Sequence, residues 1–244
     1  MTTKLDVTFG VYSGRFGQLS EYIEAVTPGL ILNRRGLPLF VESTIVLIEA
    51  WHEDFLASLV AHATCEKEPE TRRYLIGQGR REAADCTLES LIAMAVGRIG
   101  FKNRGQRMEE IFLELFGFSP WPNDAIRNQI VDLGLLRQIV VHHSSGVLGD
   151  DYWNQLTDKT LLGTNQCRDL PTIRRINHEE GLIFIRNVTR ALIEQFKYLR
   201  SEMSHRRSGS GDAWFPGRCG QSRRHIAGIQ VLDHLVIGAR GLSR

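Results

Sequence analysis

The chain is short of the residues that mark several common classes of protein. Its 244 residues include only four cysteines, and its formal net charge at pH 7 is +2. The cysteines are widely separated and form no Cys-x-x-Cys pair, which argues against a disulfide framework and against a zinc site. So small a net charge creates no general attraction for nucleic acid, so any RNA contact must come from local clusters of basic residues. This cysteine usage fits a reducing, cytoplasmic location best.

Long apolar runs are also missing. The most apolar stretches are interrupted by Glu42, Glu49 and Glu53, and the segment from Met1 to Gly14 lacks the apolar core of a signal peptide. We therefore expect neither secretion nor an interaction with the membrane. No Gly-x-Ser-x-Gly, Walker or dinucleotide-binding glycine pattern occurs, and no cofactor or metal is expected.

Apolar residues recur at helical spacing through most of the chain, which predicts an all-α protein built as an up-and-down helical bundle of about five helices. The expected helices cover residues 37–63, 81–96, 108–116, 126–143 and 182–199. Residues 1–36 are rich in glycine and contain Pro28, so they are expected to form an irregular lead-in with room for a short helix around Leu19 to Val26. The charged segment 66–79 is expected to be a hinge. Residues 37–203 then form the helical domain, and residues 204–244 form a flexible tail rich in glycine and arginine.

One apolar helix carries the most distinctive chemistry. Residues 135–141 are aliphatic except for Arg137 and Gln138, which predicts a helix that is buried over most of its circumference. Arg137 falls on the core-facing side, where its permanent charge needs a bound anion or a paired carboxylate. A Ser-Ser-Gly stop follows His143, so His142 and His143 lie in the last turn, where the helix dipole favours the imidazolium form.

A histidine that titrates near neutrality beside a fixed arginine suits attack on a phosphodiester. The histidine moves protons, and the arginine stabilises the charge that grows on the phosphate oxygens. However, Arg137 and His142 are about 140° apart on a straight helix, at about 100° per residue. Unless the helix end distorts or the arginine bends round, a complete site requires a second chain.

The string Arg137-x4-His142, inside an aliphatic helix with Gly146 just beyond it, resembles the Arg-x(4 to 6)-His signature of HEPN domains, and it looks closest to their bacterial ribonuclease-L-like branch. The earlier helix with Glu53 among apolar residues is similar to the first core helix of that branch. The resemblance covers residues 37–203.

The resemblance implies a metal-independent endoribonuclease that is a homodimer, with two motif helices meeting across a two-fold axis. Arg137 and His142 would be catalytic, and Glu53 could orient Arg137 or a histidine. His143 stands where the family often has asparagine or a small polar residue, so either histidine could act. A toxin or defence role, with an antitoxin protein as a possible partner, follows from family analogy alone.

A second cluster of charge precedes the motif helix. The segment from Arg98 to Arg107 contains no acidic residue and one aromatic ring, a composition that suits a loop along RNA phosphates. Its basic residues are Arg98, Lys102, Arg104 and Arg107. A plain solvated loop is the alternative reading, just as His52, Glu53 and Asp54 can be read as a solvated helix face.

The motif helix also has a purely structural interpretation. Arg137 would then pair with Glu53 or Asp132, His142 would cap the helix end, and His143 would lie on the surface. The corresponding functions are a non-catalytic HEPN module that binds nucleotide or a protein partner, and a helical scaffold without any ligand.

Overall fold

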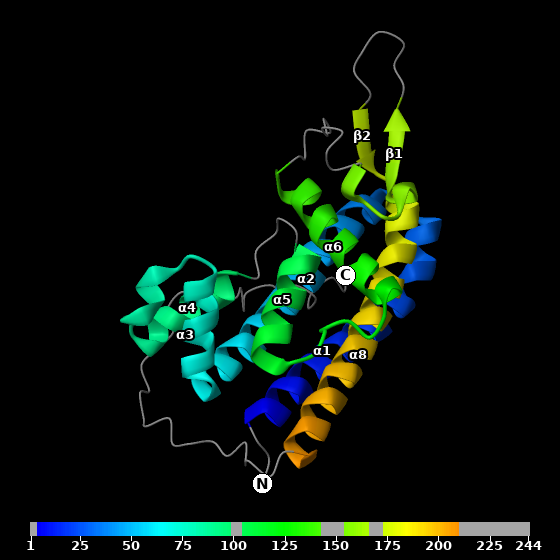
Figure 1. The fold of residues 1–244 in the computed structure, drawn as a ribbon. Coiled ribbons are helices and arrows are strands. Elements are labelled where there is room, and N and C mark those ends of the chain that lie inside the picture. Colours follow the sequence, from blue (N-terminus) through cyan, green and yellow to red (C-terminus); the bar gives the residue numbers. More distant parts are fainter. Residues whose placement is uncertain (1–3, 99–103, 143–153, 166–172, 210–244) are drawn as a thin grey trace, which may run out of the picture. The chain divides into compact units, whose positions relative to one another are not determined.

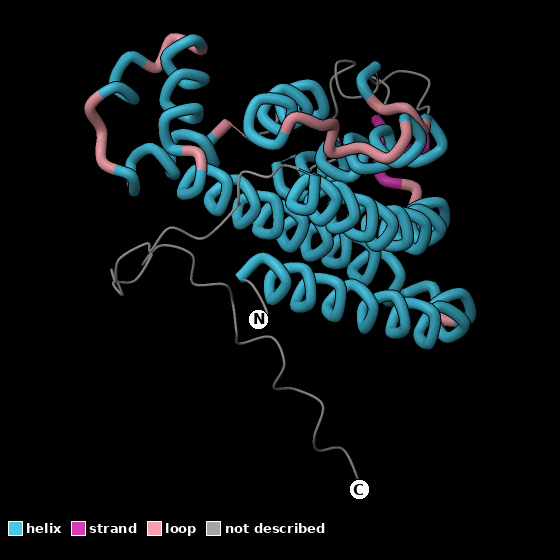
Figure 2. Tube along the Cα trace, turned by 60° about the horizontal axis from the view of Figure 1, so that its bottom comes forward, coloured by secondary structure: helices cyan, strands magenta, loops and turns pink. Residues whose placement is uncertain are grey.

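The structure, a computed structural model, describes residues 4–98, 104–142, 154–165 and 173–209, and all of these belong to one unit that spans Met1–Trp214. The all-α class is confirmed, because the described residues form seven α-helices, three short 3-10 helices and one two-stranded sheet (Figures 1 and 2). The α-helices are α1 (Lys4–Leu32), α2 (Leu37–Glu66), α3 (Glu68–Gly77), α4 (Leu88–Gly97), α5 (Arg104–Phe116), α6 (Asp124–His142) and α8 (His178–Gly209). The other elements are η1 (Arg34–Gly36), η2 (Arg81–Ala84), η3 (Lys159–Leu161), β1 (Leu162–Asn165) and β2 (Ile173–Ile176). None of the described helices is long and apolar enough to cross a membrane.

Helix α1 corrects the expectation of an irregular lead-in. One of its faces carries an apolar residue at every third or fourth position and packs against α2 and α8. The buried residues of this face are Leu5, Phe9, Tyr12, Phe16, Leu19 and Ile23. Glycine inside a helix costs about 1 kcal/mol relative to alanine, but burial of large side chains along the opposite face outweighs that cost. The prediction of an irregular segment is therefore wrong for residues 4–18 and 27–32, and the short helix expected around residues 19–26 is part of α1.

Helices α1, α2 and α8 form the centre of the unit. The rings of Phe9 and Phe196 both contact the ring of Phe55, with centroids 5.4 Å and 4.2 Å apart respectively, so the three helices share one aromatic core. Glu24 in the second half of α1 pairs with Arg186 near the start of α8, and Asp6 near the start of α1 pairs with Arg200 further along α8, so the two helices run in opposite directions. Figure 1 shows α1, in blue, alongside α8, in yellow and orange.

Close approach of α8 to α2 depends on a glycine. A Cβ atom at Gly181 would lie 2.7 Å from Cγ1 of Val41, which is too close for any side chain. His178, one turn earlier, contacts Glu42 with Nε2 3.0 Å from Oε1. The start of α8 is therefore fixed against the start of α2, and the two helices run in the same direction from there.

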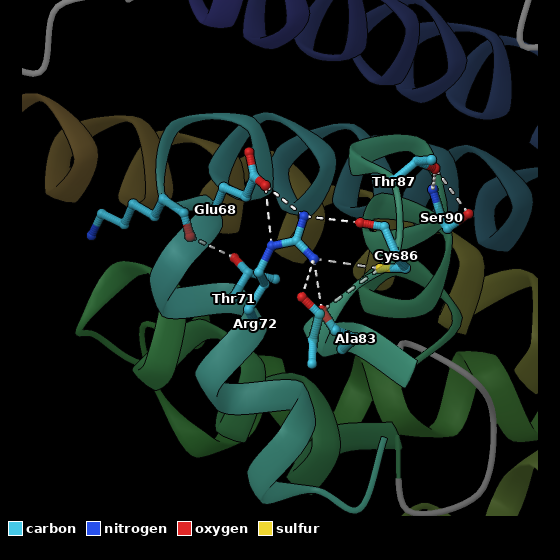
Figure 3. A network of polar contacts seen from close by, with 9 residues as sticks. Glu68, Thr71, Arg72, Ala83, Cys86, Thr87 and Ser90 are labelled. Carbon is cyan, nitrogen blue, oxygen red and sulfur yellow. Dashed lines mark hydrogen bonds and ion pairs between the residues drawn. The ribbon is translucent and has the colours of Figure 1, made fainter. Parts of the chain in front are cut away.

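Polar contacts of Arg72 connect α3 to the segment that leads into α4 (Figure 3). Its guanidinium donates to the carbonyl oxygens of Ala83 and Cys86 at 2.7 Å and 3.0 Å, and it pairs with Glu68 at 2.6 Å. Thr87 caps α4, which begins only at Leu88. The expected hinge at 66–79 is therefore mostly helical, and the single helix expected for 81–96 is wrong in its first half.

Helix α6 confirms the prediction of a continuous motif helix for residues 126–142. Asn123 caps its start, with Oδ1 accepting a hydrogen bond of 2.9 Å from the N–H of Ile126. The helix runs unbroken to His142, and it packs against α2, α8 and α5. His143 lies outside the described residues.

A short hairpin precedes α8 and was not expected from the sequence. Strands β1 and β2 pair in antiparallel fashion, with the register Leu162↔Ile176, Gly163↔Arg175, Thr164↔Arg174 and Asn165↔Ile173. Leu162 and Ile176 are buried, so the hairpin contributes to the core. Helix α8 extends to Gly209, past the predicted boundary at 203, and the remainder of the predicted tail lies outside the described residues.

Candidate functional site

Arg137 is half-buried on the side of α6 that faces the core. The neighbours on its stripe, Ile126, Ile130 and Leu133, are all buried. Helix α6 packs against α2, and the charge of Arg137 acts on Glu53 there. Burial raises the pKa of the Glu53 carboxyl group, and the nearby Arg137 opposes that rise. The structure therefore brings together Arg137 and Glu53, two residues that the sequence analysis placed in one site.

Asp132, the other carboxylate considered for Arg137, is engaged with the backbone. Its Oδ1 and Oδ2 atoms accept hydrogen bonds from the N–H groups of Thr157 and Asp158, at 2.8 Å and 2.9 Å. Burial raises the pKa of this carboxyl group, and the two N–H donors oppose the rise. Asp132 thus holds the segment that precedes the hairpin against α6.

His142 is the last residue of α6, and its side chain is exposed. Since it lies five positions after the half-buried Arg137 on an unbroken helix, the two side chains leave the helix about 140° apart. The described part of the chain therefore does not bring His142 and Arg137 together.

The four basic residues predicted to bind RNA do not lie on one loop. Arg98 follows α4, and its guanidinium donates to Oε1 of Gln78 at 3.1 Å. Arg104 is the first residue of α5, and Arg107 is half-buried on the same helix. Lys102 lies outside the described residues. The prediction of a loop is wrong from Arg104 onward, because the amphipathic pattern that begins at Met108 extends one turn further back than expected.

The alternative interpretation of His52 as part of a solvated helix face is wrong. His52 is fully buried, with Nε2 3.0 Å from Oε1 of Gln195 on α8, and the amide nitrogen of Gln195 donates to the carbonyl oxygen of Pro120 at 3.1 Å. Burial lowers the pKa of His52 to about 4, although the Gln195 hydrogen bond opposes that effect. His52 and Gln195 are separated by 143 residues in sequence, so no local pattern could have revealed their contact.

The His52 hydrogen bond fixes a proton position and a helix arrangement. Because Gln195 accepts through Oε1, Nε2 of His52 carries the hydrogen, and Nδ1 is left with a lone pair that no described residue reaches. The bonds join α2, α8 and the connector that leads into α6. They therefore help to set the helix that carries Arg137 relative to the helix that carries Glu53.

Of the four predicted catalytic residues, the described part of the chain brings two together, Arg137 and Glu53. A guanidinium is held beside a carboxylate at the contact between α2 and α6, and an imidazole stands at the solvent-exposed end of the same helix. Within the described ranges, no group of three or more His, Cys, Asp and Glu side chains is arranged to hold a metal ion.

No family model, no curated protein and no solved structure matches the chain.

Proposed function

We propose that the chain is a metal-independent endoribonuclease that acts as a homodimer. The observation that supports this proposal is the position of Arg137, half-buried at the contact between α2 and α6 beside the Glu53 carboxylate. A guanidinium that is already held in place does not have to be ordered during the reaction, so it can stabilise charge that develops on a phosphate. The resemblance of the Arg137-x4-His142 string to the HEPN signature supports the same chemistry.

The proposed reaction is an internal transfer of the phosphate. The RNA 2′-hydroxyl group attacks the adjacent phosphorus, the bond from phosphorus to the 5′ oxygen breaks, and the products carry a 2′,3′-cyclic phosphate and a 5′-hydroxyl group. His142 accepts the proton of the attacking hydroxyl group, and a protonated histidine donates a proton to the leaving oxygen. His143 is a candidate for that second histidine. Arg137 binds the non-bridging oxygens of the phosphorane, and Glu53 orients Arg137.

A dimer would supply the second histidine of the proposed reaction. His142 continues a stripe of α6 with Leu135 and Gln138, which are half-buried. Spacings of three and four residues let such a stripe pack against a second helix. A two-fold contact between two copies of α6 would cover the stripe and place two His142 side chains in one cleft.

The second candidate function is a non-catalytic HEPN module that binds nucleotide or a protein partner. The direction of His142, away from Arg137 on the same helix, favours this alternative. In that case, Arg137 and Glu53 form a structural ion pair between α2 and α6.

Cleavage of RNA in the presence of a chelator separates the two functions. Arg137→Ala and His142→Ala should each reduce cleavage by about 100-fold or more, whereas RNA binding should fall less. The matched control is Arg127→Ala, which removes a positive charge from the same helix at a side chain that pairs with Glu109 at 3.8 Å. This control should cleave RNA at nearly the wild-type rate.

The products and the assembly provide two further criteria. Cleavage should leave a cyclic phosphate end, and the wild type should sediment as a dimer at micromolar concentration. A requirement for added magnesium, or full activity after replacement of Arg137 and both histidines, would show that α6 is not the catalytic element. Each variant must retain its helical circular dichroism before its activity is interpreted.

The proposed toxin or defence role has its own test. Expression of the wild type in a bacterial host should arrest growth, and expression of Arg137→Ala should not. Equal growth of both strains at equal protein levels would argue against a toxin.

A further inference from the structure

Arg15 of α1 lies over two aromatic rings. Its guanidinium carbon is 5.3 Å from the centroid of the Tyr12 ring and 5.7 Å from that of Trp51 on α2. Tyr12 is buried, and its hydroxyl group donates a hydrogen bond to the Asp54 carboxylate. Two rings that are themselves fixed therefore hold the guanidinium in position.

The N–H groups of Arg15 are open to a ligand. Among the residues that the structure describes, none accepts a hydrogen bond from Arg15 or forms an ion pair with it. Neighbouring arginines on α8 differ, because Arg186 and Arg190 both pair with Glu24. A planar guanidinium with free N–H groups is suited to two parallel hydrogen bonds with a phosphate.

Apolar and aromatic side chains continue from Arg15 along the same surface, of which Tyr22 and Leu47 are exposed and Phe40 and Trp51 are half-buried. Tyr22 is 56% exposed, and its ring lies 6.2 Å from that of Phe40, centroid to centroid. Tyr22 follows Arg15 by seven residues, which is about 10 Å along α1. On α2, Leu47 lies between Phe40 and Trp51 in sequence and is also exposed. We call these five residues, Arg15, Tyr22, Phe40, Leu47 and Trp51, the α1–α2 strip.

The α1–α2 strip is separate from the candidate catalytic group. Trp51 and Glu53 belong to the same helix, but at about 100° per residue they point about 160° apart. The strip therefore lies on the side of α2 that is turned away from Arg137. Nothing in the proposed cleavage reaction uses it.

We propose that the α1–α2 strip binds single-stranded RNA, with Arg15 on a phosphate group and Tyr22 stacked on a base. One ordered cation together with an exposed aromatic ring is a combination that proteins use to bind unpaired nucleotides. An acidic peptide fits less well, because its carboxylates could pair with Arg15 but it has no base to stack on the Tyr22 ring. The inference concerns binding alone and holds whether or not the chain cleaves RNA.

Binding of a labelled, 2′-O-methylated 12-nucleotide RNA to the full chain tests the proposal by fluorescence anisotropy. This RNA has no free 2′-hydroxyl group, so it cannot be cleaved by the proposed reaction. Arg15→Gln and Tyr22→Ala should each raise the dissociation constant by about 10-fold. Tyr22→Phe, which keeps the ring, should bind almost as tightly as the wild type. Arg200→Gln is the matched control, because it removes one charge from α8 at an exposed side chain, and it should change the dissociation constant less than 2-fold.

Three outcomes would overturn the proposal. Equal weakening by Arg15→Gln and Arg200→Gln would mean that only the general charge of the surface matters. Competition by free adenosine monophosphate at the concentration of the RNA would indicate a mononucleotide site. Unchanged binding by folded Arg15→Gln protein would place the RNA elsewhere. Loss of cleavage activity is judged separately, with Arg137→Ala on unmodified RNA, so failure of one proposal does not affect the other.

Discussion

Acidification should destabilise this protein through one buried side chain, His52. In the folded state its pKa is about 4, against an ordinary value of 6.5, because the ring is fully buried. The unfolded chain therefore takes up a proton at His52 at a pH where the folded chain does not. The contribution of His52 to the free energy of unfolding is complete above about pH 6.5. It is lost as the pH falls toward about 4, and it changes no further below that pH.

The pKa values set the size of this effect. A difference of about 2.5 in pKa, at about 1.4 kcal/mol for each pKa unit, amounts to about 3 kcal/mol of unfolding free energy. Total stabilities of single domains are about 5–15 kcal/mol, so the loss is a substantial fraction of the whole. The raised pKa values of Glu53 and Asp132 act in the opposite direction, so they reduce the net slope of the wild type.

Comparison with a variant isolates the contribution of His52. His52→Gln cannot take up a proton, and its amide can still donate to Gln195. Urea unfolding of both proteins between pH 7 and pH 4 should show the wild type losing about 3 kcal/mol more than the variant. The control His142→Gln changes an exposed side chain and should follow the wild type closely. Parallel curves for wild type and His52→Gln would refute the claim that His52 is buried and neutral in the folded state.

Three further predictions concern stability. Gly181→Ala should lower the free energy of unfolding in urea by about 1–3 kcal/mol, because the new methyl group would clash with α2. Gly10→Ala, where the new Cβ meets open space, should raise it by up to about 1 kcal/mol. Asp132→Ala removes the acceptor for two N–H groups, so hydrogen exchange at residues 157 and 158 should become faster; unchanged protection would contradict the assigned bonds. Arg137→Ala should lower the melting temperature at pH 7 by leaving the half-buried Glu53 without its cation, and adding Glu53→Gln should recover part of the loss.

The motif helix was predictable because its signals are local. Asn123 supplies the cap, the apolar stripe has helical spacing, and Arg137 continues that stripe toward the core. An arginine on a core-facing stripe needs a negative partner, and Glu53 was one of two carboxylates named for that role. Its proximity to Arg137 is confirmed.

Helix α1 was missed because its sequence contains two conflicting signals. Gly10, Gly14 and Gly17 suggest turns, but a Cβ at any of these positions would meet open space, so they face away from the packed side. The apolar residues on the other side specify the helix, and their burial against α2 and α8 outweighs the low helix propensity of glycine. Local propensity could not reveal that contact with distant parts of the chain.

The burial and hydrogen bond of His52 could not be predicted from the sequence for a different reason. A histidine followed by two acidic residues, Glu53 and Asp54, has the local sequence of a solvated face, and only Gln195, on the last described helix, identifies His52 as a core residue. The exposed position of His142, by contrast, follows from the helical spacing alone. Sequence reasoning therefore located the residues of the motif helix but not the hydrogen bonds that fix it.

The contact between α1 and α8 affects how the protein is made. Glu24 and Arg186 are separated by 162 residues, so the first and last described helices can pack only after the start of α8 has left the ribosome. At synthesis rates of about 5–20 residues per second, α1 waits roughly 10 seconds or more for its partner. Loop closure over so long a distance also slows folding relative to helical proteins with local contacts. If the chain cleaves RNA as proposed, a nascent copy lacks the finished bundle until α8 has left the ribosome, so cleavage cannot begin before that point.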